Sequence, residues 1–72
     1  MKMWITKKNK GGLVFLWLHK PFYKESCNMW FYYENGVADE DNLRFGLYLG
    51  RNIFPEVTFE NSPMEVELVI KK

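Results

Sequence analysis

The stretch LVFLWL at residues 13–18 is apolar at all six positions. Successive side chains of a β-strand point to opposite faces, so a strand with one face in water alternates apolar and polar residues. Residues 13–18 therefore predict a strand that is covered on both faces. Because no long helix is predicted elsewhere in the chain, we expect the cover to come from the sheet curling over the strand, from a second copy of the protein, or from both.

The length of 72 residues predicts a single small β domain over residues 1–72. A core of this size typically contributes only about 3–5 kcal/mol of net stability, so an additional stabilising device is expected. Cys27 is the only cysteine and His19 the only histidine, which argues against a disulfide, a structural metal or a cofactor. A homo-oligomer, a dimer or higher, is therefore expected.

Composition narrows the partners and the location. Aromatic residues make up 18% of the chain, which favours β structure, and the formal net charge of +1 gives no general attraction to nucleic acid or to anionic membranes. The longest apolar run has six residues, fewer than the roughly 7–15 of a signal-peptide core or the about 20 of a membrane span. We therefore expect a cytoplasmic protein, in the host cell cytoplasm if it is encoded by a phage.

Two strands are predicted in the first third of the chain. Residues 3–6 are rich in β-forming residues and precede the loop KKNKGG, in which Asn9, Gly11 and Gly12 supply the positive φ angles of a hairpin. The chain then returns along residues 13–18. Pro21 ends this second strand because it cannot donate to a sheet ladder, and residues 23–26 are expected to form a loop.

The middle of the chain predicts a strand, a loop and a second strand. Residues 28–34 read NMWFYYE, and their alternation puts Trp30 and Tyr32 on one side of a strand. An acidic loop is expected over residues 35–42. Residues 43–49 alternate again and predict one strand with Leu43, Phe45, Leu47 and Leu49 on one face.

The C-terminal third predicts two turns and a last strand. Pro55 suits the start of a tight turn and favours an extended Phe54, and residues 61–63 predict a second turn. Residues 64–72 alternate, with Glu65 and Glu67 on the outer face of an edge strand. The fold class is therefore mainly β: a small antiparallel sheet or a half-closed barrel of about five strands, with at most one short helical turn.

Catalytic chemistry is not expected. His19 lacks a nucleophile and an orienting acid nearby in the sequence, so we interpret it as a surface residue at a strand end. Cys27 is expected to be a small buried residue. Asp39 and Asp41 lack the spacing of a calcium loop and are expected to be solvated. The protein is therefore predicted not to be an enzyme.

The aromatic residues are the enrichment that could be functional. They exceed what a core this small can hide, and an exposed aromatic ring beside Lys or Arg can stack on a base while the cation binds its phosphate. Core packing explains most of them, and both arginines could be ordinary surface charges. The candidate ligand-binding residues are Trp17, Trp30, Tyr32, Tyr48, Arg44 and Arg51.

The ending FPEVTFENSPMEVELVIKK at residues 54–72, with MWI at residues 3–5 and KP at residues 20–21, carries a resemblance. It resembles a group of small uncharacterised proteins of gut bacteria and of their phages or mobile elements. The likeness covers the last third of the chain well and the first third loosely, while residues 22–50 depart from it. It implies a setting in which small, oligomeric, non-catalytic proteins act against host defence.

Three functions follow as hypotheses. The leading one is a non-enzymatic binding protein, encoded by a phage or mobile element, that acts against host defence by sequestering a nucleotide-like signal in an oligomer. The alternative is an inhibitor or interaction module that binds a host protein through an aromatic patch. Single-stranded nucleic-acid binding is a weaker third hypothesis because the net charge is close to zero.

Overall fold

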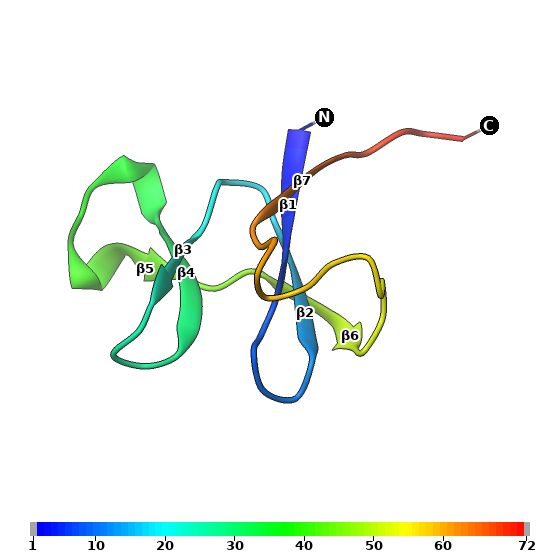
Figure 1. Cartoon of the computed structure of the whole chain (residues 1–72). Coiled ribbons are helices and arrows are strands. Elements are labelled where there is room, and N and C mark those ends of the chain that lie inside the picture. The colour runs from blue at the N-terminus through cyan, green and yellow to red at the C-terminus, as the bar shows by residue number, and fades with distance from the viewer. Residues whose placement is uncertain (1, 72) are drawn as a thin grey trace.

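The computed structural model describes residues 2–71 and shows two small antiparallel sheets (Figure 1). The protein is mainly β, as predicted, and neither sheet closes into a barrel. The first sheet has the strand order β6-β2-β1-β7, formed by Leu47–Arg51, Leu13–Trp17, Lys2–Lys7 and Met64–Glu67. The second has the order β3-β4-β5, formed by Phe22–Lys24, Met29–Tyr33 and Leu43–Arg44. Two single 3₁₀ turns, η1 (Glu34–Gly36) and η2 (Glu40–Asn42), are the helical elements of residues 2–71.

The predicted β1–β2 hairpin is confirmed. Trp4 lies opposite Trp17 and Ile5 opposite Leu16 across the antiparallel pair. The loop between the strands has φ angles of 81° at Gly11 and 62° at Gly12, values that glycine adopts without the steric cost of a Cβ atom. Asn9 was also expected to have a positive φ, and this prediction is wrong.

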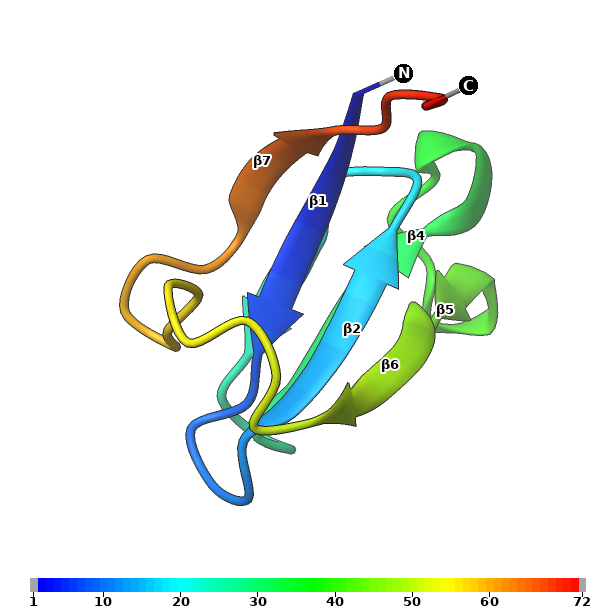
Figure 2. The ribbon, with the colours of Figure 1, turned by 90° about the vertical axis from the view of Figure 1, so that its right-hand side faces the viewer.

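One face of β2 is covered by the chain segment that follows β6. Val14 is fully buried and clusters with Ile5 of β1 and with Val57, which belongs to the loop between β6 and β7. Leu16 and Ile53 pack against the edge of this cluster. Figure 2 shows this loop beside the ends of β1 and β6.

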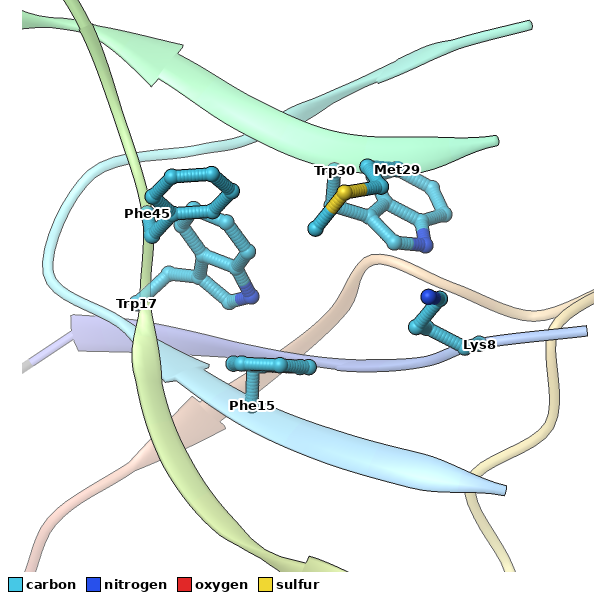
Figure 3. A pocket seen from close by; sticks show the side chains of 6 residues that line it. All are labelled: Lys8, Phe15, Trp17, Met29, Trp30 and Phe45. Atoms are coloured by element: carbon cyan, nitrogen blue, oxygen red, sulfur yellow. The ribbon is translucent and has the colours of Figure 1, made fainter. Parts of the chain in front are cut away.

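The other face of β2 is covered by the second sheet. Trp17 is only 2% exposed, and together with Phe15 it lies opposite Trp30 of β4 and Phe45 (Figure 3). The indole Nε1 of Trp17 donates a hydrogen bond of 2.9 Å to Oγ1 of the buried Thr6. Other parts of the same chain thus cover both faces of β2. The fold does not need a second copy of the protein to cover this strand.

The prediction of one strand over residues 43–49 is wrong. The chain leaves the second sheet after β5 and joins the first at β6, so it crosses between the sheets at Phe45 and Gly46. A Cβ atom at Gly46 would lie 2.7 Å from ring atoms of Trp17, a separation at which atoms overlap. Glycine is therefore needed here for close passage past the indole, and one face cannot contain Leu43, Phe45, Leu47 and Leu49.

The predicted loop at residues 23–26 is also wrong, because Phe22–Lys24 forms β3. Phe22 pairs with Phe31 and Tyr23 with Trp30 of β4. The predicted strand at residues 28–34 is confirmed as β4, with slightly shorter bounds. Residues 2–71 contain seven strands where about five were predicted, because of β3 and of the break at Gly46.

The C-terminal third is partly as predicted. The amide of Val57 donates to the carbonyl oxygen of Phe54 at 2.9 Å, which confirms the turn at Pro55. Phe54 itself has a φ of 52° and is not extended. The last strand stops at Glu67, and the apolar side chains that follow are more than half exposed: Leu68, Val69 and Ile70.

We predict that Val14→Ala destabilises the protein by about 2 kcal/mol, because it removes buried methyl groups and leaves a cavity under the loop that contains Val57. The free energy of unfolding in urea measures the effect. Val37→Ala is the matched control, since Val37 is more than half exposed and surface changes of this kind typically alter stability by less than about 0.5 kcal/mol. Equal effects at the two positions would contradict the assignment of Val14 to the core.

A second prediction concerns the hydrogen bond between Trp17 and Thr6. Thr6→Val keeps the shape of the side chain but leaves the buried Nε1–H of Trp17 without its acceptor, which typically costs about 1–3 kcal/mol. In a Trp17→Phe background the donor is absent, so the same substitution should cost much less. Urea unfolding of the four proteins of this cycle gives the coupling energy, and a coupling near zero would contradict the prediction.

Candidate ligand-binding site

Two of the candidate residues belong to the interior. Trp17 and Trp30 are 2% and 7% exposed, and both line a gap of about 10 Å³ between the sheets (Figure 3). Such a volume is close to the minimum that holds one water molecule. The two tryptophans are therefore core residues in this structure, and neither offers a ring face to a ligand from solvent.

Tyr32 connects the core to the surface. Its ring meets Trp17 edge-on, with centroids 6.1 Å apart, and it stacks on the imidazole of His19 at a centroid distance of 5.2 Å and an interplanar angle of 30°. His19 follows β2 in the first sheet, while Tyr32 lies on β4 in the second. The ring pair thus lies where the end of one sheet meets the other, and the buried indole fixes the position of Tyr32.

A cleft of about 570 Å³ opens beside this ring pair, and we call it the His19 cleft. Pockets that hold small ligands typically enclose roughly 300–1,000 Å³. Its wall contains a second ring pair, Phe22 and Tyr33, stacked with centroids 4.8 Å apart. The residues that line the cleft are His19, Lys20, Phe22, Tyr32, Tyr33, Glu34, Asn35 and Gly36.

The charges around the His19 cleft are partly compensated. Glu34, which lines it, forms an ion pair of 2.7 Å with Arg44. The same guanidinium donates to the backbone carbonyl oxygens of Asp41 and Leu43, at 2.8 and 2.9 Å. Arg44 therefore neutralises Glu34 and holds the end of η2, while Lys20 takes part in none of the ion pairs found over residues 2–71.

Two more candidate residues lie elsewhere. Tyr48 on β6 is exposed and packs against Phe15, with ring centroids 5.6 Å apart. Arg51 pairs with Leu13 at the start of β2, the opposite end of that strand from His19. The six predicted residues therefore do not form one site. Tyr32 alone lines the His19 cleft, Arg44 supports it through Glu34, and Tyr48 and Arg51 are separate from it.

Sequence reasoning missed most of the cleft. His19 is exposed at a strand end, as predicted, but it was not recognised as part of a site, and neither were Lys20 and Asn35. One signal was present in the sequence: His19 and Lys20 directly follow the apolar stretch at residues 13–18. This signal indicates a binding site only once the fold places β4 beside the end of β2.

A second depression is apolar, and we call it the Phe45 groove. It encloses about 220 Å³ beside the crossing at Gly46. Leu18, Phe45 and Leu47 at its rim are 58%, 59% and 65% exposed. No charged side chain is among the residues that line it, which are Met3, Leu16, Trp17, Leu18, Tyr32, Phe45, Gly46 and Leu47.

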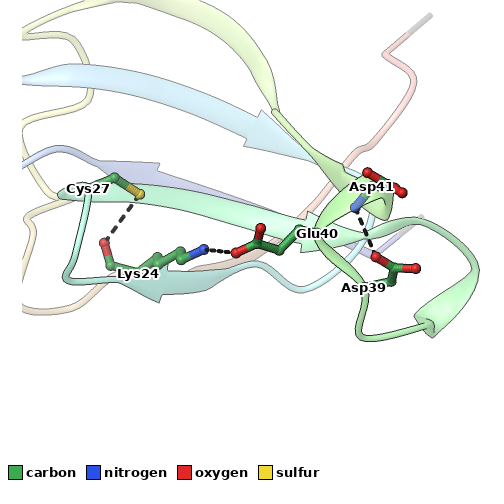
Figure 4. A network of polar contacts seen from close by, with 5 residues as sticks. All are labelled: Lys24, Cys27, Asp39, Glu40 and Asp41. Carbon is green, nitrogen blue, oxygen red and sulfur yellow. Dashed lines mark hydrogen bonds and ion pairs between the residues drawn. The ribbon is translucent and has the colours of Figure 1, made fainter.

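Side-chain contacts stabilise the acidic loop at residues 35–42 (Figure 4). Asp39 Oδ1 accepts a hydrogen bond of 3.1 Å from the amide of Asp41, and Glu40 forms an ion pair of 3.4 Å with Lys24. Residues 2–71 contain no group of three or more His, Cys, Asp or Glu side chains that could hold a metal ion. Cys27 is exposed, so the prediction that it is buried is wrong.

No family model matches the chain, and no curated protein and no solved structure matches it either. The resemblance to small proteins of gut bacteria and their phages therefore stays a prediction. Over the part of the chain that the structure describes, no helix has both the length and the apolar character needed to cross a membrane. The cytoplasmic location also stays a prediction.

Proposed function

We propose that this is a non-enzymatic binding protein that holds a nucleotide-like ligand in the His19 cleft. One observation carries the proposal: the cleft, of about 570 Å³, is lined by two stacked ring pairs, His19 with Tyr32 and Phe22 with Tyr33, and by the cationic side chain of Lys20. A nucleotide needs both kinds of contact, a ring face for its base and a cation for its phosphate.

Each wall of the cleft suits one part of such a ligand. Stacking on an aromatic ring typically contributes about 1–3 kcal/mol per base. The ammonium of Lys20 is a mobile point charge that binds a phosphate oxygen without requiring a fixed planar geometry. The ion pair between Glu34 and Arg44 supports the proposal because it compensates the carboxylate that would otherwise repel the phosphate.

The ligand would be held and not changed. The residues that line the cleft include no serine, threonine or cysteine that His19 could activate as a nucleophile. Binding without turnover suits a protein that sequesters a signal. The further step, that the protein comes from a phage or mobile element and acts against host defence, rests on the resemblance carried by residues 54–72, 3–5 and 20–21 alone.

We also propose that the protein is a homo-oligomer in which a second copy covers the Phe45 groove. Three large apolar side chains surround the groove and no charged side chain lines it, so its burial removes apolar surface from water without desolvating a charge. One rival surface for self-association is the edge strand β7, which presents exposed charged side chains: Glu67, and Glu65 in an ion pair of 3.1 Å with Lys2. A two-fold axis at the groove brings like apolar residues together.

The nucleotide proposal is tested by thermal unfolding with a panel of linear and cyclic nucleotides. We expect at least one of them to raise the melting temperature in a concentration-dependent way, because a ligand that binds only the folded state stabilises it. Lys20→Met should weaken that ligand about tenfold, as expected for the loss of one charge-assisted contact.

Lys10→Met is the matched control, because Lys10 is an exposed lysine in the β1–β2 loop and does not line the His19 cleft. It should leave the affinity unchanged. If no nucleotide binds at millimolar concentration, the nucleotide proposal fails. Equal loss in the two variants would assign the binding to net charge and not to the cleft.

Oligomerisation is tested by light scattering behind a sizing column at micromolar concentration. We expect a mass above the 8.7 kDa of one chain, and we expect Leu47→Lys to return the protein to that mass, because it places a charge at the rim of the groove. Val69→Lys, a change at an exposed apolar residue outside the groove, is the control. A monomeric wild-type protein would overturn the proposal.

The alternative function, an interaction module that inhibits a host protein, is favoured by the same exposed side chains of Leu18, Phe45 and Leu47. The two proposals differ in what covers the groove. A protein that is monomeric and binds no nucleotide would leave the Phe45 groove as an open apolar surface, and the interaction module would then be preferred.

A further inference from the structure

The interior gap between the sheets contains an unpaired donor. Trp30 is 7% exposed, and its indole Nε1 is fully buried without a hydrogen-bond partner. Among residues 2–71 it is the one buried side-chain nitrogen or oxygen in this condition. Trp17, in the same interior, donates its own Nε1–H to Thr6. A buried indole N–H without an acceptor is costly, so its surroundings need an explanation.

A cation faces this donor. Lys8 follows β1, is half-buried, and lines the gap together with Trp30. Figure 3 shows the nitrogen of Trp30 and the ammonium nitrogen of Lys8 directed toward one another. Both groups only donate hydrogen bonds, and the positive end of the N–H dipole faces a positive charge. The arrangement is favourable only if an acceptor lies between them.

The acceptor must be small and need no hydrogen-bond acceptor of its own. The gap has room for about one water-sized species, at about 10 Å³. Its lining supplies no side-chain oxygen, because the residues are Lys8, Phe15, Trp17, Met29, Trp30 and Phe45. A water molecule would accept from both donors but would find no side-chain acceptor among these residues for its own two hydrogens. A monatomic anion only accepts, and it also compensates the ammonium in surroundings of low polarity.

We propose that the gap between the sheets binds one halide ion, held by the Nε1–H of Trp30 and the ammonium of Lys8. Such an ion links the loop after β1 to β4 of the second sheet, and it therefore stabilises the packing of the two sheets. This site is separate from the His19 cleft and shares no lining residue with it.

The test compares sodium chloride, sodium bromide and sodium iodide with sodium gluconate at constant ionic strength. Gluconate is the reference because this polyatomic anion is too large for the gap. Bromide and iodide quench tryptophan fluorescence on contact. We expect a saturable quenching component from bromide held at Trp30, weaker with the larger iodide, in addition to linear quenching by collision. We expect chloride and bromide, relative to gluconate, to raise the melting temperature of the wild type more than that of Lys8→Met.

Lys8→Met should remove the saturable component or weaken it at least tenfold, while Lys10→Met, two residues further along the same loop, should retain it. Trp30→Phe, which removes the N–H donor, should respond to halide as Lys8→Met does, because only the general effect of each salt on stability then remains. Equal halide effects in the wild type and in Lys8→Met would mean that the gap holds only water and would overturn the proposal.

Discussion

The packing of Trp17 between the two sheets is the contact on which the rest of this structure depends. The indole is 2% exposed, donates to Thr6, and meets Tyr32 edge-on. A residue with a Cβ atom at position 46 would collide with its ring, so the chain passes Trp17 at Gly46 as it crosses from the second sheet to the first. The same side chain thus fills the core, sets the crossing and fixes an aromatic ring at the edge of the His19 cleft.

The parts of the fold that could be predicted are those determined by neighbouring residues. β-forming residues located β1, a continuous apolar run located β2, a run of aromatic residues located β4, and glycines located the loop between β1 and β2. The break between β5 and β6 could not be predicted, because the alternation of residues 43–49 continues through it. Its cause is the contact between Gly46 and Trp17, which are distant in the sequence. The strand β3 was missed for a related reason, since three residues form a strand only because β4 lies beside them.

The sequence predicted which types of side chain form the candidate site, but not which residues. Composition indicated more aromatic side chains than an ordinary small core needs, but it could not indicate which of them are hidden. Trp17 and Trp30 fill the space between the sheets, whereas Tyr32 reaches the surface. Arg44 was predicted as a cation that could bind a phosphate beside aromatic rings, and the structure pairs it with Glu34. Lys20 was overlooked because its role depends on the aromatic strand β4, which is brought next to it by the fold.

The two surface depressions share one structural origin. A strand that continued through residues 43–49 would hide alternate side chains on one face, but the chain crosses between the sheets at Phe45 and Gly46, and Phe45 and Leu47 stay more than half exposed at the rim of the Phe45 groove. The His19 cleft is connected to the same place through Tyr32, whose side chain lines both depressions and meets Trp17 edge-on. Trp17 determines where the crossing lies, although it lines the Phe45 groove and not the His19 cleft. A substitution that shrinks this indole should therefore alter both the groove and the cleft.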